Sequence, residues 1–226
     1  MKLDMELPGG GRALFTERAD GNMSSVSGPE HEHGARRREE ICTRAGAKGL
    51  VRGYQVHGTH VRRVREMPDP PVSTGRPEDA DGQATPVPGL AAMVLAADCM
   101  PVALGCEGTV AAIHAGWRGL AAGVLEEGVA ALRELADSHV HIGAAIGPGA
   151  GPCCYEVGEE VHAVFGGAHR DQQRIDLKAI ARERLLAAGV AEVRDVGLCT
   201  ICDERFFSYR REGVGAGRQA GVAWLS

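Results

Sequence analysis

Three short apolar runs lie close together in the middle of this chain, and they constrain its fold more than any other feature. They cover Leu90–Ala97, Pro101–Leu104 and Thr109–Ile113, and turn residues separate them from their neighbours. Apolar runs of about four to eight residues that end at turn residues are typical of buried strands. The chain is therefore expected to be built around a β-sheet.

The hydrophobic period changes directly after these runs. From Trp117 to Ala136, apolar and small residues recur at steps of three and four positions. The positions that carry this pattern are Leu120, Val124, Gly128, Ala131, Leu132 and Leu135. Such a spacing predicts an amphipathic helix that packs on the sheet.

Similar patterns elsewhere predict the remaining elements. Strands are expected at 12–16, 141–146, 190–198 and 219–225, and helices at 35–48, 156–165 and 177–188. Asp176 is the expected N-cap of the last helix, which Gly189 ends. Because strands and helices do not alternate regularly, a doubly wound parallel sheet is not expected. The chain is predicted to be an α+β protein with mixed sheets.

Two stretches are predicted to be long loops. Residues 19–34 are rich in Gly, Ser and His, and Pro68–Pro88 contains six prolines. A loop as long as the second one is usually a lid, a binding loop or a disordered segment. Candidate metal ligands lie on both sides of it, so neither loop is interpreted as a linker. Residues 1–226 are accordingly expected to form a single domain.

Charge, hydropathy and cysteine usage exclude several classes of protein. The net charge of −5 argues against nucleic-acid binding, and no apolar run reaches the roughly 18 residues of a membrane span. The acidic start, Met1–Glu6, lacks the apolar region of a secretory signal. The seven cysteines form no recognisable disulfide framework, so reduced thiols and a cytoplasmic location are expected.

One pair of cysteines, Cys199 and Cys202, forms a C-x-x-C motif. Such a motif occurs in redox sites and as half of a zinc ribbon, but also where cysteines simply pack. No second pair stands at the spacing of a ribbon, and the preceding segment does not begin a thioredoxin-like unit. Packing is the favoured interpretation, and a functional role is the alternative.

Three good metal ligands, His57, Cys99 and His114, lie beside glycine or proline at breaks between hydrophobic runs. Side chains at such breaks collect at the ends of strands. Two imidazoles and one thiolate leave a fourth tetrahedral position open, as in catalytic zinc sites, whereas structural sites are closed by a fourth protein ligand. Their scattered spacing matches no local metal motif. On residue type alone, buried histidines and a core cysteine are an equal alternative.

Several longer motifs surround these residues in a fixed order. They are QVHG (55–58), ADCMP (97–101), HAGWRG (114–119), PCCYEVG (152–158) and FFSYRR (206–211). Through these motifs the chain resembles the multicopper polyphenol oxidase, or laccase-domain, family from about Ala13 to Trp224. Members of that family are also called peptidoglycan editing factors and are now viewed as zinc-dependent purine nucleoside enzymes.

The resemblance implies a fold, a metal and an activity. It implies two sheets packed together with helices outside, and a catalytic Zn²⁺ ion held by His57, Cys99 and His114. It further implies phosphorolysis of adenosine, inosine and S-methyl-5′-thioadenosine with phosphate, and deamination of adenosine to inosine. Copper, which the older family label suggests, would need many more histidines in paired clusters than this set provides.

Several residues are candidates for substrate binding. Arg118 lies in the turn Gly116–Gly119, which opens a helix, so its guanidinium and the first helical amides are expected to bind phosphate. Gly147–Pro152 is a second turn of this kind, and a simple packing turn is the alternative for both. The resemblance adds Arg18, from a shortened N-terminal motif, and Arg210, from FFSYRR, for which a surface position is the alternative.

Two neighbours of the candidate ligands also have two interpretations each. Asp98 either orients a metal-bound imidazole or is a turn residue before Pro101. Trp117 either stacks on a purine or anchors the core at the start of a helix.

Other functions are compatible with the same residues. Cys99 with a histidine base would also suit a thiol hydrolase. The family labels add a copper-dependent polyphenol oxidase and a cell-wall peptidoglycan editing factor. The leading hypothesis is a zinc-dependent purine nucleoside phosphorylase and adenosine deaminase. Its expected partners are purine nucleosides and phosphate, with no nucleic acid and no membrane.

Overall fold

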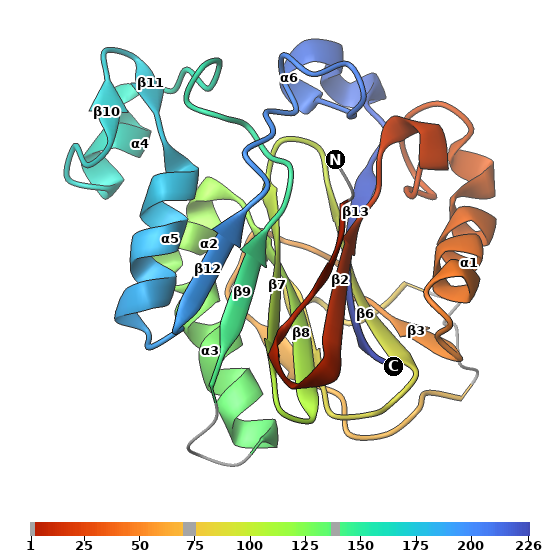
Figure 1. The fold of residues 1–226 in the computed structure, drawn as a ribbon. Coiled ribbons are helices and arrows are strands. Elements are labelled where there is room, and N and C mark those ends of the chain that lie inside the picture. Colours follow the sequence, from red (N-terminus) through yellow and green to blue (C-terminus); the bar gives the residue numbers. More distant parts are fainter. Residues whose placement is uncertain (1–2, 70–75, 137–140) are drawn as a thin grey trace.

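A five-stranded sheet forms one half of the core in the computed structural model, which describes residues 3–69, 76–136 and 141–226 (Figure 1). Its strands are β1 (Asp4–Glu6), β2 (Gly11–Phe15), β3 (Gly49–Val51), β6 (Leu90–Ala96) and β13 (Gln219–Leu225). They lie in the order β1-β2-β13-β6-β3. Strand β13 is central and antiparallel to β2 and β6, whereas β3 runs parallel to β6.

A six-stranded sheet forms the other half of the core. Its strands are β4 (Val61–Arg63), β5 (Gly82–Thr85), β7 (Met100–Cys106), β8 (Thr109–Ala115), β9 (Gly143–Ile146) and β12 (Glu192–Asp195). They lie in the order β12-β9-β7-β8-β5-β4, with antiparallel pairs at the centre and a parallel pair at each edge. Both sheets are mixed, so the predicted α+β class with mixed sheets is confirmed.

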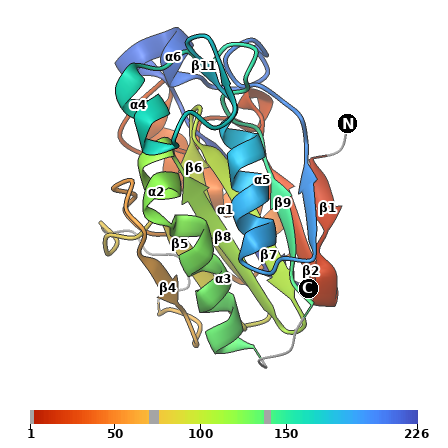
Figure 2. The ribbon, with the colours of Figure 1, turned by 90° about the vertical axis from the view of Figure 1, so that its left-hand side faces the viewer.

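Helices lie outside the two sheets, some on their outer faces and others at one end (Figure 1). They are α1 (Gly34–Arg44), α2 (Trp117–Ala122), α3 (Val124–Leu135), α4 (Glu159–Val164), α5 (Leu177–Ala187) and α6 (Tyr209–Glu212). Helix α1 lies beside the five-stranded sheet, and α3 and α5 lie side by side on the six-stranded sheet (Figures 1 and 2). The layered arrangement implied by the resemblance is therefore present. None of the helices in the described residues has the length and hydropathy needed to cross a bilayer.

The central strands read as continuous apolar runs because both of their faces are buried. In β7 and β8, Ala103 and Ala112 belong to the apolar cluster between the sheets, whereas Val102, Leu104 and Ile113 belong to the cluster under the helices. Small residues recur on the inter-sheet side: Ala13, Ala92, Ala103, Ala112, Ala145 and Ala223. Small side chains at these positions allow the two sheets to approach closely.

The single helix predicted from Trp117 to Ala136 is wrong in one respect, because the structure divides it into α2 and α3. Gly123 lies between them with φ of 100°, in the left-handed region that favours glycine. Its N–H donates to the carbonyl oxygens of Gly119 and Leu120, which ends α2. The apolar spacing continues across the break, so periodicity alone did not reveal it.

The loop predicted at Pro68–Pro88 is also wrong in part, because strand β5 lies within it. Its residues are fully buried, including the polar side chains of Gln83 and Thr85, so the expected apolar signal is missing. Residues 70–75 of this stretch lie outside the described residues. The other elements that sequence patterns missed are short: β1, β3, β4, α6, and the two-stranded ribbon of β10 (Arg170–Asp171) and β11 (Arg174–Ile175).

The predicted N-cap at Asp176 is confirmed. Its Oδ1 accepts hydrogen bonds from the backbone N–H groups of Lys178 and Ala179, each at 3.0 Å. We expect Asp176→Ala to lower the free energy of unfolding by about 1 kcal/mol, since two first-turn N–H groups lose their acceptor. Urea denaturation followed by circular dichroism measures this. Asp176→Asn keeps a good cap and should stay near the wild type, so equal losses in both variants would contradict the capping role.

Candidate active site

A cavity of about 510 Å³ opens at the end of the two sheets where β6 passes into β7 and β8 passes into α2. Its wall includes Leu95–Met100 and His114–Arg118 from these two connections, and Arg52–Gln55 from the segment after β3. Tyr155 and Tyr209 add aromatic surface. A cavity of this size, lined by apolar and a few polar groups, suits a small-molecule ligand.

The three candidate metal ligands meet at the wall of this cavity. The donor atoms of His57, Cys99 and His114 all lie within 4.8 Å of one another, and Cys99 Sγ is 3.8 Å from His57 Nε2. Tetrahedral bonds of about 2.0–2.3 Å would place neighbouring donor atoms roughly 3.3–3.8 Å apart. The predicted convergence of the three side chains is thus present, and the 3.8 Å between Cys99 Sγ and His57 Nε2 fits two ligands of a shared metal ion.

Strand pairing explains how Cys99 and His114 come together. In the antiparallel pair β7–β8, Pro101 lies opposite His114 and Met100 opposite Ala115. Continuing this register by one residue places Cys99 opposite Gly116. A Cβ on Gly116 would be 2.9 Å from both Cys99 Sγ and His57 Cδ2, so only glycine fits between these two side chains.

A buried carboxylate, Asp81, organises the rest of this cluster. It accepts backbone hydrogen bonds from Val56 (3.1 Å), His57 (3.0 Å) and Gly58 (2.7 Å), and a fourth from His114 Nδ1 at 2.8 Å. The first three bonds hold His57 at φ of 60°, a conformation uncommon for a residue other than glycine. The fourth engages Nδ1 of His114 and leaves its Nε2 free to bind a metal.

Sequence reasoning missed Asp81, although the orienting role itself was anticipated for Asp98. The structure gives Asp98 different partners: Thr200 Oγ1 donates to its carboxylate at 2.7 Å, and so does the backbone N–H of Arg210 at 2.7 Å. Asp98 has φ of 84°, so it also makes the turn between β6 and β7. Asp98 therefore ties the cavity wall to the C-terminal segment, while Asp81 orients His114.

The cluster is electrostatically coupled. Burial raises the pKa of Cys99, but His114 and the hydrogen bonds from both imidazoles lower it more, so the net pKa lies below the usual range of a thiol. Burial lowers the pKa of His114, but Cys99 and Asp81 raise it above the usual range of an imidazole. The three groups therefore favour a thiolate, which is the form of cysteine that binds metals and acts as a nucleophile.

Two of the three arginines proposed from sequence reach the cavity. Arg118 lines it and stacks over the ring of Trp117 at 4.2 Å. Arg210 lines it, donates to the carbonyl oxygen of Glu156 at 2.7 Å and stacks over the ring of Tyr155 at 4.7 Å.

Arg18 is not among the residues that line this cavity. Its guanidinium donates to the carbonyl oxygens of Glu204 and Phe206, forms an ion pair with Glu212 and stacks over Phe207. The structure thus gives Arg18 a packing role near residues 204–212.

Two other arginines, Arg52 and Arg218, line the cavity and were missed by sequence reasoning. Both are half-buried, and burial lowers the pKa of each. Within residues 3–69, 76–136 and 141–226, neither forms an ion pair with a carboxylate. Arg52 directly follows β3 and Arg218 directly precedes β13, and each lies next to a glycine (Gly53 and Gly217). This sequence context is too common to indicate a functional site. Two half-buried guanidinium groups without a carboxylate partner favour an anionic ligand in this cavity.

Comparison with known proteins gives one consistent group of relatives. Residues 12–226 match the family described as multi-copper polyphenol oxidoreductase laccase. A purine nucleoside phosphorylase of Xylella fastidiosa is 39% identical over 237 residues, which cover 96% of this chain and 88% of that protein. The purine nucleoside phosphorylase YfiH of Escherichia coli is 40% identical over 188 residues, which cover 76% and 72% of the two chains.

Solved structures with the same fold include two bacterial proteins. The Neisseria meningitidis protein NMB0706 matches with a TM-score of 0.82 and 30% identity, over 100% of both chains. YlmD from Geobacillus stearothermophilus matches with a TM-score of 0.81 and 27% identity, over 96% of this chain and 92% of its own. The whole chain, including the segments that build the cavity, therefore shares its architecture with these proteins.

We expect Asp81→Ala to weaken metal binding at the cluster by about 10- to 100-fold, because His57 and His114 both lose the group that orients them. A competition titration with a chromophoric chelator measures the affinity, and circular dichroism checks the fold. Asp79→Ala is the matched control, since Asp79 lies in the same segment but forms an ion pair with Arg76 at the surface. An unchanged affinity in a folded Asp81→Ala variant would show that Asp81 does not support the ligands.

Proposed function

This chain belongs to the multi-copper polyphenol oxidoreductase laccase family, and from that membership we propose that it is a purine nucleoside phosphorylase. The observation that carries the proposal is the convergence of His57, Cys99 and His114 beside a cavity lined by arginines that form no ion pair with a carboxylate of the described residues. Relatives that are 34–41% identical and carry the name purine nucleoside phosphorylase support it.

The donor set fits a zinc ion better than copper. Two imidazoles and one thiolate are typical zinc ligands, and three protein ligands leave a position for substrate or water. Multicopper chemistry needs several histidine-rich clusters. The described residues contain two groups of three or more clustered candidate ligands, and only the group of His57, Cys99 and His114 contains histidine. We therefore propose His57, Cys99 and His114 as the ligands of one zinc ion.

Bound zinc would supply a Lewis acid at the wall of the cavity. In phosphorolysis, a phosphate oxygen forms a bond to the anomeric carbon of the ribose while the bond from that carbon to the purine nitrogen breaks. The cationic side chains of Arg52, Arg118 and Arg218 would hold the phosphate and reduce the cost of its charge in a partly buried cavity. Tyr155 and Trp117 would pack against the purine, as aromatic walls commonly do.

The proposed substrates are adenosine, inosine and S-methyl-5′-thioadenosine, with phosphate as the second substrate. We further propose that adenosine is deaminated to inosine in the same cavity: a water oxygen forms a bond to C6 of the purine while the bond from C6 to the amino nitrogen breaks, and ammonia leaves. Arg210 would contribute to the substrate-facing wall, since its guanidinium lies over the ring of Tyr155.

A thiol hydrolase is the second candidate, and one observation favours it. The pKa of Cys99 is lowered by its two imidazole neighbours, as in cysteine nucleophiles. A carboxylate such as Asp81 orients a histidine base as well as a metal-bound imidazole, so that contact fits both candidates. A nucleophile needs one histidine base, however, whereas this thiol faces two imidazoles. This arrangement favours a ligand set over a nucleophile–base pair.

We expect Cys99→Ser to lose one equivalent of bound zinc and to abolish phosphorolysis of adenosine, because a hydroxyl is a poor replacement for a thiolate ligand. Elemental analysis and an assay of purine release with adenosine and phosphate measure the two effects. Cys106→Ala is the control, since Cys106 is buried in β7 and belongs to no ligand cluster. A Cys99→Ser variant that keeps its zinc but no longer forms a covalent thioester-type intermediate would support the thiol hydrolase instead.

We expect Arg52→Ala and Arg118→Ala each to raise the KM for phosphate by about 10- to 100-fold, since a charge-assisted contact contributes roughly 1.5–3 kcal/mol. The KM for the nucleoside and the rate of adenosine deamination should change much less. Arg36→Ala is the control, because Arg36 is exposed on α1 and pairs with Glu40. Equal losses toward phosphate and nucleoside would mean that these arginines support the fold, and that phosphate binds elsewhere, such as at the Gly147–Pro152 turn.

A further inference from the structure

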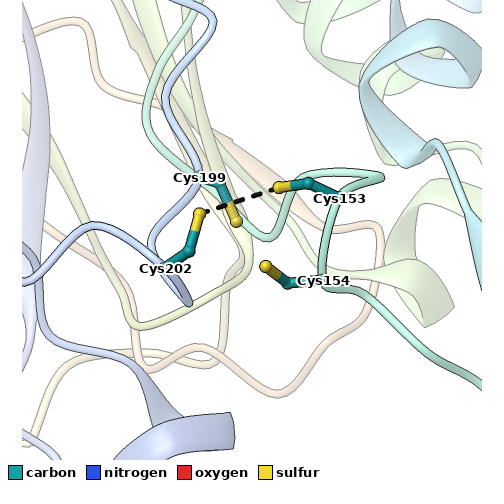
Figure 3. A group of neighbouring side chains, drawn as sticks. All are labelled: Cys153, Cys154, Cys199 and Cys202. Atoms are coloured by element: carbon teal, nitrogen blue, oxygen red, sulfur yellow. Dashed lines mark hydrogen bonds between the residues drawn. The ribbon is translucent and has the colours of Figure 1, made fainter.

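A second cluster of metal-binding side chains lies in the segments that follow β9 and β12. It consists of the four thiols of Cys153, Cys154, Cys199 and Cys202 (Figure 3). All four sulfur atoms lie within 4.8 Å of one another, and Cys153 Sγ is 3.7 Å from Cys202 Sγ. The C-x-x-C motif thus has a partner pair that sequence spacing did not predict, and the packing interpretation does not explain why four sulfurs meet.

The 3.7 Å between Cys153 Sγ and Cys202 Sγ is close to the spacing of two ligands in a metal site. Four thiolates at about 2.3 Å from a tetrahedral zinc ion lie roughly 3.8 Å from one another. A disulfide needs two sulfurs at about 2.05 Å, whereas Cys153 and Cys202 are 3.7 Å apart and all four cysteines are free thiols in this structure. In Figure 3 the four side chains come from two separate segments and their sulfurs point toward a common centre.

Backbone groups around the cluster already support sulfur ligands. The N–H of Gly151 donates to Cys199 Sγ at 3.2 Å, and N–H donors to a thiolate are the kind of outer contact that stabilises a metal ligand. Arg211 donates to the carbonyl oxygens of Thr200 and Ile201, at 2.9 and 2.8 Å, and so fixes the turn between Cys199 and Cys202. The two cysteines of the motif are therefore held in place from both sides of the turn.

We propose that Cys153, Cys154, Cys199 and Cys202 bind one structural zinc ion. Four protein ligands close the coordination sphere, so this ion takes no part in chemistry. Its function is to join the turn after β9 to the loop after β12.

The segment after β9 contributes Ala150 and Tyr155 to the cavity wall, and the segment after β12 is hydrogen-bonded to that wall, so the second ion would brace the candidate active site. Thr200, inside the C-x-x-C motif, donates to Asp98 beside the ligand Cys99. Cys154 directly precedes Tyr155, which lines the cavity beneath Arg210. Loss of the four-cysteine ion should therefore loosen this wall without removing any ligand of the first ion.

The zinc content of purified protein tests the proposal directly. We expect two equivalents in the wild type and in the Cys106→Ala control, and one equivalent in Cys153→Ser/Cys202→Ser. Cys99→Ser should also hold one equivalent, but at the four-cysteine site. Its cobalt-substituted form should then show the strong charge-transfer absorption of a tetrahedral site with four sulfur ligands. This spectrum should disappear when the Cys153 and Cys202 substitutions are added.

A measurement on the wild type avoids variants that fail to fold. Cys153 and Cys202 are exposed, so they would react readily with an alkylating reagent unless a metal holds their sulfurs. We expect mass spectrometry to show slow alkylation of both cysteines in zinc-loaded protein and an acceleration of at least tenfold after a chelator is added.

Three outcomes would overturn the proposal. They are equal alkylation rates with and without chelator, a single zinc equivalent that persists in Cys153→Ser/Cys202→Ser, and a native mass lower by two hydrogens through a disulfide between Cys153 and Cys202. Absence of nucleoside phosphorolysis would refute the proposed function but would leave these metal measurements unaffected.

Discussion

The carboxylate of Asp81 accepts four hydrogen bonds in the interior of the protein, and the candidate active site depends on them. An ionised carboxylate is costly to bury unless its oxygens are fully paired. Here the partners are three successive N–H groups of the 56–58 loop and the imidazole of His114. The hydrogen bonds that reduce the cost of burying Asp81 also fix the backbone of His57 and the ring of His114.

The two-sheet core makes this arrangement possible. Close packing over alanine side chains brings the ends of β6, β7 and β8 together at one end of the two sheets, so residues distant in sequence meet there. The segments after β9 and β12, which carry the four cysteines, also lie at this end of the sheets. The proposed catalytic and structural ions would thus lie in segments that the hydrogen bond from Thr200 to Asp98 joins.

Sequence reasoning succeeded where one segment carries its own signal. The strand at Gln219–Leu225 and the cap at Asp176 were identifiable locally. The family motifs singled out His57, Cys99 and His114, which the fold brings together. It failed where the signal is divided between segments. Asp81 is an ordinary aspartate in a proline-rich stretch until the fold supplies its four donors. The partners of Cys199 and Cys202 likewise come from a turn that no spacing rule connects to them.

The position of β13 has a consequence for how the protein is made. This strand is the last element of the chain, yet it lies between β2 and β6 at the centre of the five-stranded sheet. As the chain leaves the ribosome, β2 and β6 have no neighbour to pair with on their facing edges until Gln219–Leu225 has emerged. Every residue of the two candidate metal-binding clusters is synthesised before that point, so these thiols and imidazoles are present while the fold is still incomplete. Reducing conditions and regulated metal supply during synthesis would therefore matter more to this protein than to one whose ligands come last.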